Sequence, residues 1–114
     1  MNDCIFCRIA KGEIPSRKVY EDEELFAFHD INPVASTHVL VVPKKHISGP
    51  AEVGEADVAL VGEMIRRAGL IAKDLKLPEG AYRLVFNNGT GAGQTVFHLH
   101  LHLLGGRKFS WPPG

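Results

Sequence analysis

The chain has 114 residues, of which 45% are hydrophobic, and its 13 basic side chains balance its 13 acidic ones. This length and composition suit one folded domain with its own core, which we expect to span residues 1–114. The balanced charge gives no broad positive surface, so we expect neither nucleic acid nor an anionic membrane as a partner.

The N-terminal half of the chain contains one predicted helix and three predicted strands. Apolar residues at helical spacing predict a short helix at about residues 4–11, with Gly12 as its C-cap. Strand patterns at 18–21 and 25–29, joined by an acidic turn, predict a hairpin. After an Asn-Pro break, the β-branched and apolar run at 37–43 predicts a third strand.

The C-terminal half contains a long predicted helix and further strands. Apolar residues recur every three or four positions from about 55 to 76, and Pro78 ends this pattern. A strand is predicted at 81–87, followed by a polar loop at 88–93. Because the strands adjoin one another instead of alternating with helices, we expect an α+β fold with a five-stranded antiparallel sheet, one long helix and one short helix.

The most informative segment alternates histidines with apolar residues between Phe97 and Leu103; its histidines are His98, His100 and His102. A period of two predicts a strand with one wholly apolar face and three imidazoles on the other, roughly 6–7 Å apart. Buried imidazoles need partners for their donor and acceptor atoms, so three on one face indicate a site rather than core packing. The site could hold a metal ion, or a nucleophile between two assisting groups.

The loop that precedes the histidines favours chemistry on a phosphate. Three glycines between Asn88 and Gly93 let backbone N–H groups approach an anion, and Gln94 and Thr95 add further hydrogen-bonding groups. An anion cradle beside a nucleophilic imidazole predicts that His100 attacks phosphorus. A neighbouring histidine would stabilise charge or protonate the leaving group.

Cys4 and Cys7 are the only cysteines, and they form a Cys-x₂-Cys pair. Such a pair supplies two of the four ligands of a structural zinc site, and the alternative is two buried thiols. A thioredoxin-like redox pair is disfavoured because only three residues precede Cys4, too few for the preceding strand. With no secretory leader, no membrane-length apolar run and no disulfide framework, we expect a cytoplasmic protein.

The run from His98 to Leu104 resembles the His-φ-His-φ-His-φ-φ signature of the histidine triad (HIT) family of nucleotide hydrolases and transferases. Five further segments, in order, resemble the Hint branch of that family in particular. They are Phe28-His29-Asp30-Ile31, Thr37-His38-Val39, Pro43-Lys44-Lys45-His46-Ile47, Gly93-Gln94-Thr95 and the final Gly-Gly-Arg…Trp-Pro-Pro-Gly. The resemblance covers essentially the whole chain.

The resemblance implies hydrolysis of purine nucleoside phosphoramidates, or of aminoacyl-adenylates, to the nucleoside monophosphate. By this analogy His100 forms a nucleotidyl-histidine that water then releases, and His102 stabilises the phosphate or assists the leaving amine. Thr95 would hydrogen-bond the phosphate or leaving group, and His38 would support His100 from a neighbouring strand. The implied contacts with an AMP-like nucleotide are Phe28 and Ile31 at the base, Asp30 at the ribose, Asn87 at the ribose or phosphate, and Gly93 and Gln94 in the cradle.

The resemblance also implies a structural zinc ion bound by Cys4, Cys7, His46 and His98, which would remove His98 from catalysis. No metal would take part in the chemical step. The family pairs as homodimers through long helices and adjoining strands, with Trp111 near the partner's site. Two alternatives stay open: a nucleotide-binding interaction module with little catalysis, and a metallohydrolase with the three triad histidines as ligands.

Overall fold

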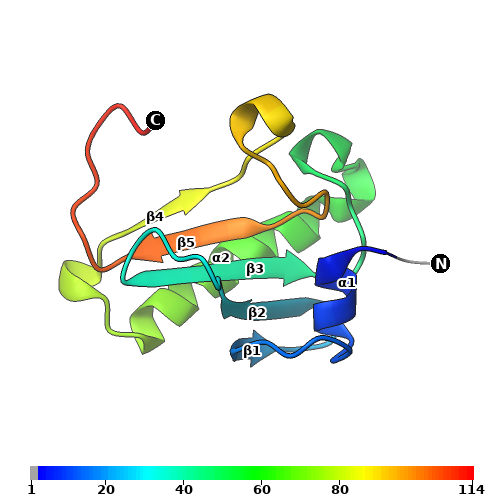
Figure 1. The fold of residues 1–114 in the computed structure, drawn as a ribbon, viewed down its shortest axis with the longest axis horizontal. Coiled ribbons are helices and arrows are strands. Elements are labelled where there is room, and N and C mark those ends of the chain that lie inside the picture. Colours follow the sequence, from blue (N-terminus) through cyan, green and yellow to red (C-terminus); the bar gives the residue numbers. More distant parts are fainter. Residues whose placement is uncertain (1–2) are drawn as a thin grey trace.

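A computed structural model describes residues 3–114 of the chain (Figure 1). Five strands form one antiparallel sheet in the order β1-β2-β3-β5-β4. The strands are β1 (Lys18–Glu21), β2 (Leu25–His29), β3 (Thr37–Pro43), β4 (Tyr82–Val85) and β5 (Leu101–Gly105). The helices are α1 (Ile5–Ala10) and α2 (Val58–Asp74), joined to the strands partly through short 3₁₀ turns. The predicted α+β fold, with one long and one short helix, is confirmed.

Asp22 shapes the β1–β2 hairpin. Its Oδ1 accepts hydrogen bonds from the backbone N–H groups of Glu24 and Leu25, each at 2.8 Å, and the Tyr20 hydroxyl donates to its Oδ2 at 2.7 Å. An aspartate that accepts from the residues after it fixes a tight turn, so the acidic turn follows from local chemistry.

The central strands β2 and β3 are covered on both faces, which explains their almost continuous apolar sequence. Figure 1 shows α2 behind the sheet and α1 at one end of the opposite face. The α2 face holds the larger core, built around residues such as Leu25, Val39, Met64 and Leu103. The α1 face holds a smaller one: Phe6, Ile9, Phe26, Phe28, Leu40 and Val42. The short α1 leaves part of its face uncovered, and the candidate site lies there.

The histidine segment is only partly a strand, which corrects the sequence prediction. Strand β5 begins at Leu101, because the Leu99 N–H donates to the Ile47 carbonyl at 2.6 Å instead of to a strand partner. Leu99 still points into the larger core with the leucines that follow it. The expected wholly apolar face fails at Phe97, whose side chain is half exposed.

Two other predicted elements are shorter than expected. The predicted helix at 55–76 is α2 preceded by a 3₁₀ turn, Glu55–Asp57, in which the Asp57 carboxylate accepts from the Gly54 N–H at 3.1 Å. The strand predicted at 81–87 is shorter in the structure, where β4 covers Tyr82–Val85.

Within residues 3–114, no helix combines the length and apolar character needed to cross a lipid bilayer.

Candidate functional site

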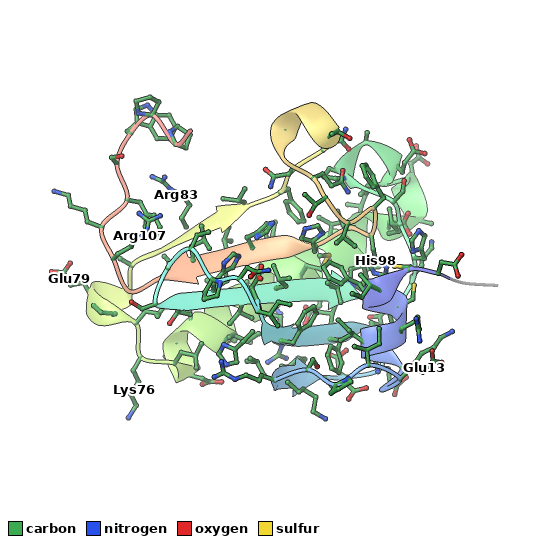
Figure 2. All side chains as sticks on the ribbon, viewed as in Figure 1. Glu13, Lys76, Glu79, Arg83, His98 and Arg107 are labelled. Atoms are coloured by element: carbon green, nitrogen blue, oxygen red, sulfur yellow. The ribbon has the colours of Figure 1, made fainter. Side chains whose placement is uncertain are left out.

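The histidines of the triad separate into two neighbouring groups. His98 turns toward the N-terminal cysteines, and Figure 2 shows its side chain beside α1. His100 and His102 instead line a cavity on the α1 face of the sheet. The segment before β5 thus serves two sites at once.

The first group brings together Cys4, Cys7, His46 and His98, whose candidate ligand atoms all lie within 4.8 Å of one another. The His98 Nδ1 lies 3.2 Å from the Cys4 Sγ, 3.4 Å from the Cys7 Sγ and 3.2 Å from the His46 Nδ1. Tetrahedral zinc with Zn–S near 2.3 Å and Zn–N near 2.0–2.1 Å places ligand nitrogens and sulfurs about 3.3–3.8 Å apart. The four residues therefore fit a Cys₂His₂ zinc site in both donor type and spacing.

A backbone hydrogen bond holds His98 in the tautomer that a metal ligand requires. Its Nε2 lies 2.7 Å from the Pro43 carbonyl, which can only accept, so Nε2 carries the proton and Nδ1 presents a lone pair to the cysteines. A backbone carbonyl in this role is typical of histidines that bind metal. Burial lowers the pKa of His98 and keeps its ring neutral. The four side chains join α1, the segment after β3 and the segment before β5.

The second group faces a cavity of about 290 Å³. Its apolar wall includes Phe6, Ile9, Phe28, Leu40 and Val96, and its polar side includes Asp30, Thr95, His100 and His102. An apolar slot with a few convergent polar groups is the usual form of a small-molecule site.

Hydrogen bonds assign the tautomer of His100. Its Nδ1 lies 2.7 Å from the His98 carbonyl, so Nδ1 carries the proton and donates. The Nε2 is then an unprotonated nitrogen on a ring that lines the cavity. Burial lowers the pKa of His100, which favours this neutral form.

A chain of hydrogen bonds gives His102 the opposite neutral tautomer from that of His100, with its proton on Nε2. The Val34 N–H donates to the His38 Nδ1 at 3.2 Å, so the His38 Nε2 carries a proton and donates to the His102 Nδ1 at 2.9 Å. The His102 Nε2 must then carry the proton of its neutral ring. This atom is buried and has no hydrogen-bond partner within residues 3–114. His100 and His102, with ring centroids 4.9 Å apart, thus offer a lone pair and an N–H hydrogen-bond donor at one site.

The contacts of His38 correct its expected role. It hydrogen-bonds His102, and its Nε2 lies 3.4 Å from the Asp30 carboxylate, whereas the sequence predicted support of His100. Asp30, His38 and His102 also lie close enough to bind a cation. The Val34 N–H on the His38 Nδ1 opposes this, because it keeps the proton on the Nε2 that would have to bind the cation.

A metallohydrolase that uses all three triad histidines as ligands does not agree with the geometry. The His98 Nδ1 faces the cysteines, the His100 Nδ1 is bonded to backbone, and the His102 Nδ1 is bonded to His38. These three rings do not offer free nitrogens to one common point.

The structure brings some of the expected nucleotide contacts to the cavity and leaves others outside it. Phe28, Asp30, Ile31 and Thr95 line it together with His100 and His102, whereas Asn87, Gly93 and Gln94 do not. The Gln94 Oε1 accepts from the Gly89 N–H at 2.8 Å, and its Nε2 donates to the Ser48 and Val96 carbonyls at 2.8 and 3.1 Å. Gln94 is therefore a brace for the glycine loop, which corrects its expected contact with ligand. Gly93 adopts a left-handed conformation, with a φ of 93°, that favours glycine.

Sequence reasoning missed the apolar wall that α1 contributes. Ile5, Phe6 and Ile9 line the cavity, but their helical spacing is the same as that of ordinary core residues. No motif marks them, and the contact of Phe6 with His100 spans more than 90 positions, so the sequence carries no local signal for this wall.

The brace around Gln94 predicts that Gly49→Ala destabilises the protein. A Cβ at position 49 would lie 3.1 Å from the Asn88 Oδ1 and 3.2 Å from the Gln94 amide atoms, so both must move. We expect a loss of about 1–2 kcal/mol in the free energy of unfolding, measured in urea. Gly62→Ala is the matched control, because nothing lies within 4 Å of its Cβ, and it should stabilise α2 by about 0.5–1 kcal/mol. Equal stability of the Gly49→Ala variant and the wild type would contradict this account of the brace.

The low pKa of the partly buried His102 predicts that the stability of the fold falls as the pH is lowered. Burial, followed by the neighbouring His100 and His38, lowers the pKa of His102 from 6.5 to about 4. Between these values the unfolded chain binds a proton that the folded chain does not, so stability is retained above about pH 6.5 and is lost progressively below it. The contribution of one such group approaches about 1.4 kcal/mol per pH unit. In urea titrations from pH 7 to 4, His102→Gln should show a shallower decline than the wild type, and equal slopes would contradict the assignment.

Comparisons with known proteins agree with this geometry. The model of the HIT domain family matches residues 11–109 of the chain. A 14 kDa zinc-binding protein of Zea mays is 47% identical over 112 residues, which cover 96% of this chain and 87% of that protein.

Solved structures lead to the same family. A HIT family hydrolase from Legionella pneumophila has a TM-score of 0.95 and 51% identity, covering 98% of this chain and all of that one. A hypothetical histidine triad nucleotide-binding protein from Sulfolobus tokodaii has a TM-score of 0.81 and 36% identity, covering 96% of this chain and 72% of that one. The match across most of the chain, in both sequence and fold, shows that this protein belongs to the HIT family.

Proposed function

We propose that this HIT family protein is a Hint-branch hydrolase, one domain over residues 1–114, that cleaves purine nucleoside phosphoramidates or aminoacyl-adenylates to the nucleoside monophosphate. The observation that carries the proposal is the complementary protonation of His100 and His102 in one cavity. The names of two similar structures, a HIT family hydrolase and a nucleotide-binding protein, support the general class.

The cavity suits a nucleotide laid across it. Its aromatic and aliphatic wall, which includes Phe6, Phe28 and Leu40, would hold the flat base. The Asp30 carboxylate at the polar side would accept hydrogen bonds from the ribose hydroxyls. The phosphate would then lie between His100, His102 and the Thr95 hydroxyl.

In the proposed first step, the His100 Nε2 lone pair attacks the α-phosphorus and the bond from phosphorus to the leaving group breaks. The His102 Nε2–H donates a hydrogen bond that stabilises the charge on the phosphoryl group, and the departing nitrogen takes its proton from solvent water. The hydrogen bond from His38 keeps the His102 N–H aimed at the cavity. In the second step, water attacks phosphorus, the bond from phosphorus to the His100 Nε2 breaks, and the proton of that water is released to solvent. The products are the nucleoside monophosphate and the free leaving group.

We also propose that Cys4, Cys7, His46 and His98 bind a structural zinc ion. The ion would tie α1 to the segments that carry His46 and His98, and it would take no part in the chemical step. The similar protein of Zea mays is named a 14 kDa zinc-binding protein, which supports this assignment. The fixed α1 then presents Phe6 to His100, whose ring centroid lies 5.0 Å away.

We propose that the chain pairs with a second copy of itself to form a homodimer. Strand β4 is an edge of the sheet, with unpaired backbone groups on its outer side. Exposed apolar side chains on β4 and α2, including Tyr82, Val58 and Ile65, suit a second copy of the chain. Light scattering during size-exclusion chromatography should give twice the 12.5 kDa mass of one chain, and a monomer at micromolar concentration would contradict this.

Adenosine 5′-phosphoramidate is the direct test of the proposed function. We expect the purified protein to convert it to AMP and ammonia without added metal, as measured by ³¹P NMR. AMP should also bind, as measured by calorimetry. Binding of AMP without any hydrolysis would overturn the proposed enzyme and favour the nucleotide-binding interaction module.

A further inference from the structure

We propose that Cys4 and Cys7 are a peroxide-sensitive dithiol, whose oxidation to an intrachain disulfide expels the metal ion and loosens the nucleotide cavity. The inference rests on the proposed zinc site. It adds a covalent modification, and the reversible loss of the ion, to what that site does.

The geometry places the two sulfurs within reach of each other. Their Sγ atoms lie within 4.8 Å, and the thiols are not bonded to each other. A disulfide requires an S–S distance of about 2.05 Å and Cβ atoms about 3.5–4.5 Å apart. Cys7 lies inside α1, but Cys4 is its N-cap with extended backbone angles, φ −68° and ψ 118°. Cys4 can therefore swing toward Cys7 without breaking a helical turn.

Access and reactivity distinguish the two thiols. Cys4 is half-buried, whereas only 4% of Cys7 is exposed, so peroxide reaches Cys4 first. A zinc-bound cysteine is already a thiolate, which is the nucleophilic form. The Cys4 thiolate attacks one peroxide oxygen, which gives a sulfenic acid and one hydroxide. The Cys7 thiolate then attacks that sulfur and releases a second hydroxide.

The reaction balances without any further reagent. Two thiolates lose two electrons to the O–O bond of hydrogen peroxide, one S–S bond forms, and the two hydroxides take protons from water. The ion then keeps only His46 and His98 as ligands. Two imidazoles are half of the donor set that a structural zinc site requires, so the ion leaves.

Oxidation reaches the cavity through Phe6, which lies between the two cysteines in sequence. Its ring centroid is 5.0 Å from that of His100, 6.0 Å from that of His98 and 5.5 Å from that of Phe28. Ile5 also lines the cavity from the same first turn of α1. Drawing Cys4 toward Cys7 moves this turn, and losing the ion frees His98. We therefore expect AMP to bind about tenfold more weakly to the oxidised protein, a loss of ~1.4 kcal/mol.

The experiment titrates the zinc-loaded protein with hydrogen peroxide in the presence of a colorimetric zinc chelator. We expect one zinc ion to be released for each Cys4–Cys7 disulfide found by peptide mass mapping. AMP affinity should fall in parallel, and reductant with added zinc should restore both. Zinc retained at full peroxide consumption, separate sulfinic acids, or a disulfide between chains would each overturn the proposal.

Two further arms keep the outcomes distinct. Cys4→His keeps four donor side chains but has only one thiol, so it should retain zinc under the peroxide dose that strips the wild type. If that variant fails to fold, the peroxide and reductant cycle of the wild type decides alone. If the wild type carries no zinc, this proposal fails together with the zinc assignment, while the proposed hydrolase is unaffected. If zinc is bound but peroxide forms no intrachain disulfide, this proposal alone is overturned.

Discussion

Replacing His100 with alanine should lower the turnover of adenosine 5′-phosphoramidate by at least about 10⁴-fold, because losing a nucleophile removes the covalent route. The His100 Nδ1 is held by the His98 carbonyl, so the Nε2 on the cavity-lining ring is the atom left to attack phosphorus. AMP should still bind within about tenfold of the wild type, since the base slot and Asp30 remain. Rapid-mixing kinetics and calorimetry measure the two effects separately.

His100→Gln controls for simple loss of packing. Glutamine fills more of the space left by the imidazole than alanine does, and it retains a polar group. The melting temperature of the His100→Gln variant should therefore stay near that of the wild type. Its turnover should nevertheless be as low as that of the alanine variant. A glutamine variant within tenfold of wild-type turnover would exclude His100 as the nucleophile.

Removing the zinc ion should lower stability by at least about 3 kcal/mol, or more than about 10 °C in melting temperature. The four ligands come from three separate segments, and His98 is completely buried beside them. Without the ion, α1 would be held mainly by its small apolar core. Calorimetry of the protein before and after chelation measures the change.

The double variant Cys4→Ser/Cys7→Ser is the matched control for zinc removal. It should contain no zinc by elemental analysis, where the wild type contains one ion per chain, and a chelator should not lower its melting temperature further. Unchanged zinc content in this variant would reject the ligand set. A wild type whose melting temperature ignores chelation would reject the structural role of the ion.

Local patterns were sufficient to predict most of the fold. Apolar periodicity placed α2 to within a few residues, and the apolar runs at 25–29 and 37–43 placed β2 and β3 at their observed bounds. The histidine segment shows that such patterns do not predict backbone hydrogen-bond partners. Its period of two persists in the buried leucines, yet the backbone at Leu99 bonds to Ile47, a distant residue that periodicity does not reveal.

The site was predictable in its residue types but less so in its contacts. The resemblance selected residues that the structure places around the cavity, including Asp30, Thr95 and His100. It did not show that His38 bonds to His102. That contact depends on the register between β3 and β5, which places Leu40 opposite His102 and so brings His38, two residues before Leu40, near that ring. It also did not show that the Gln94 side-chain amide hydrogen-bonds to Gly89 and Ser48, because these are tertiary contacts that the local sequence does not encode.

Trapping the covalent intermediate tests the central claim most directly. Enzyme mixed with excess adenosine 5′-phosphoramidate is quenched within milliseconds under alkaline conditions, which preserve a phosphorus–imidazole bond, and is then analysed by mass spectrometry. We predict a transient adenylyl group on the peptide that carries His100, attached through Nε2, which disappears as AMP accumulates. Burst kinetics without any adduct at His100, or an adduct on a different side chain, would contradict the proposed mechanism.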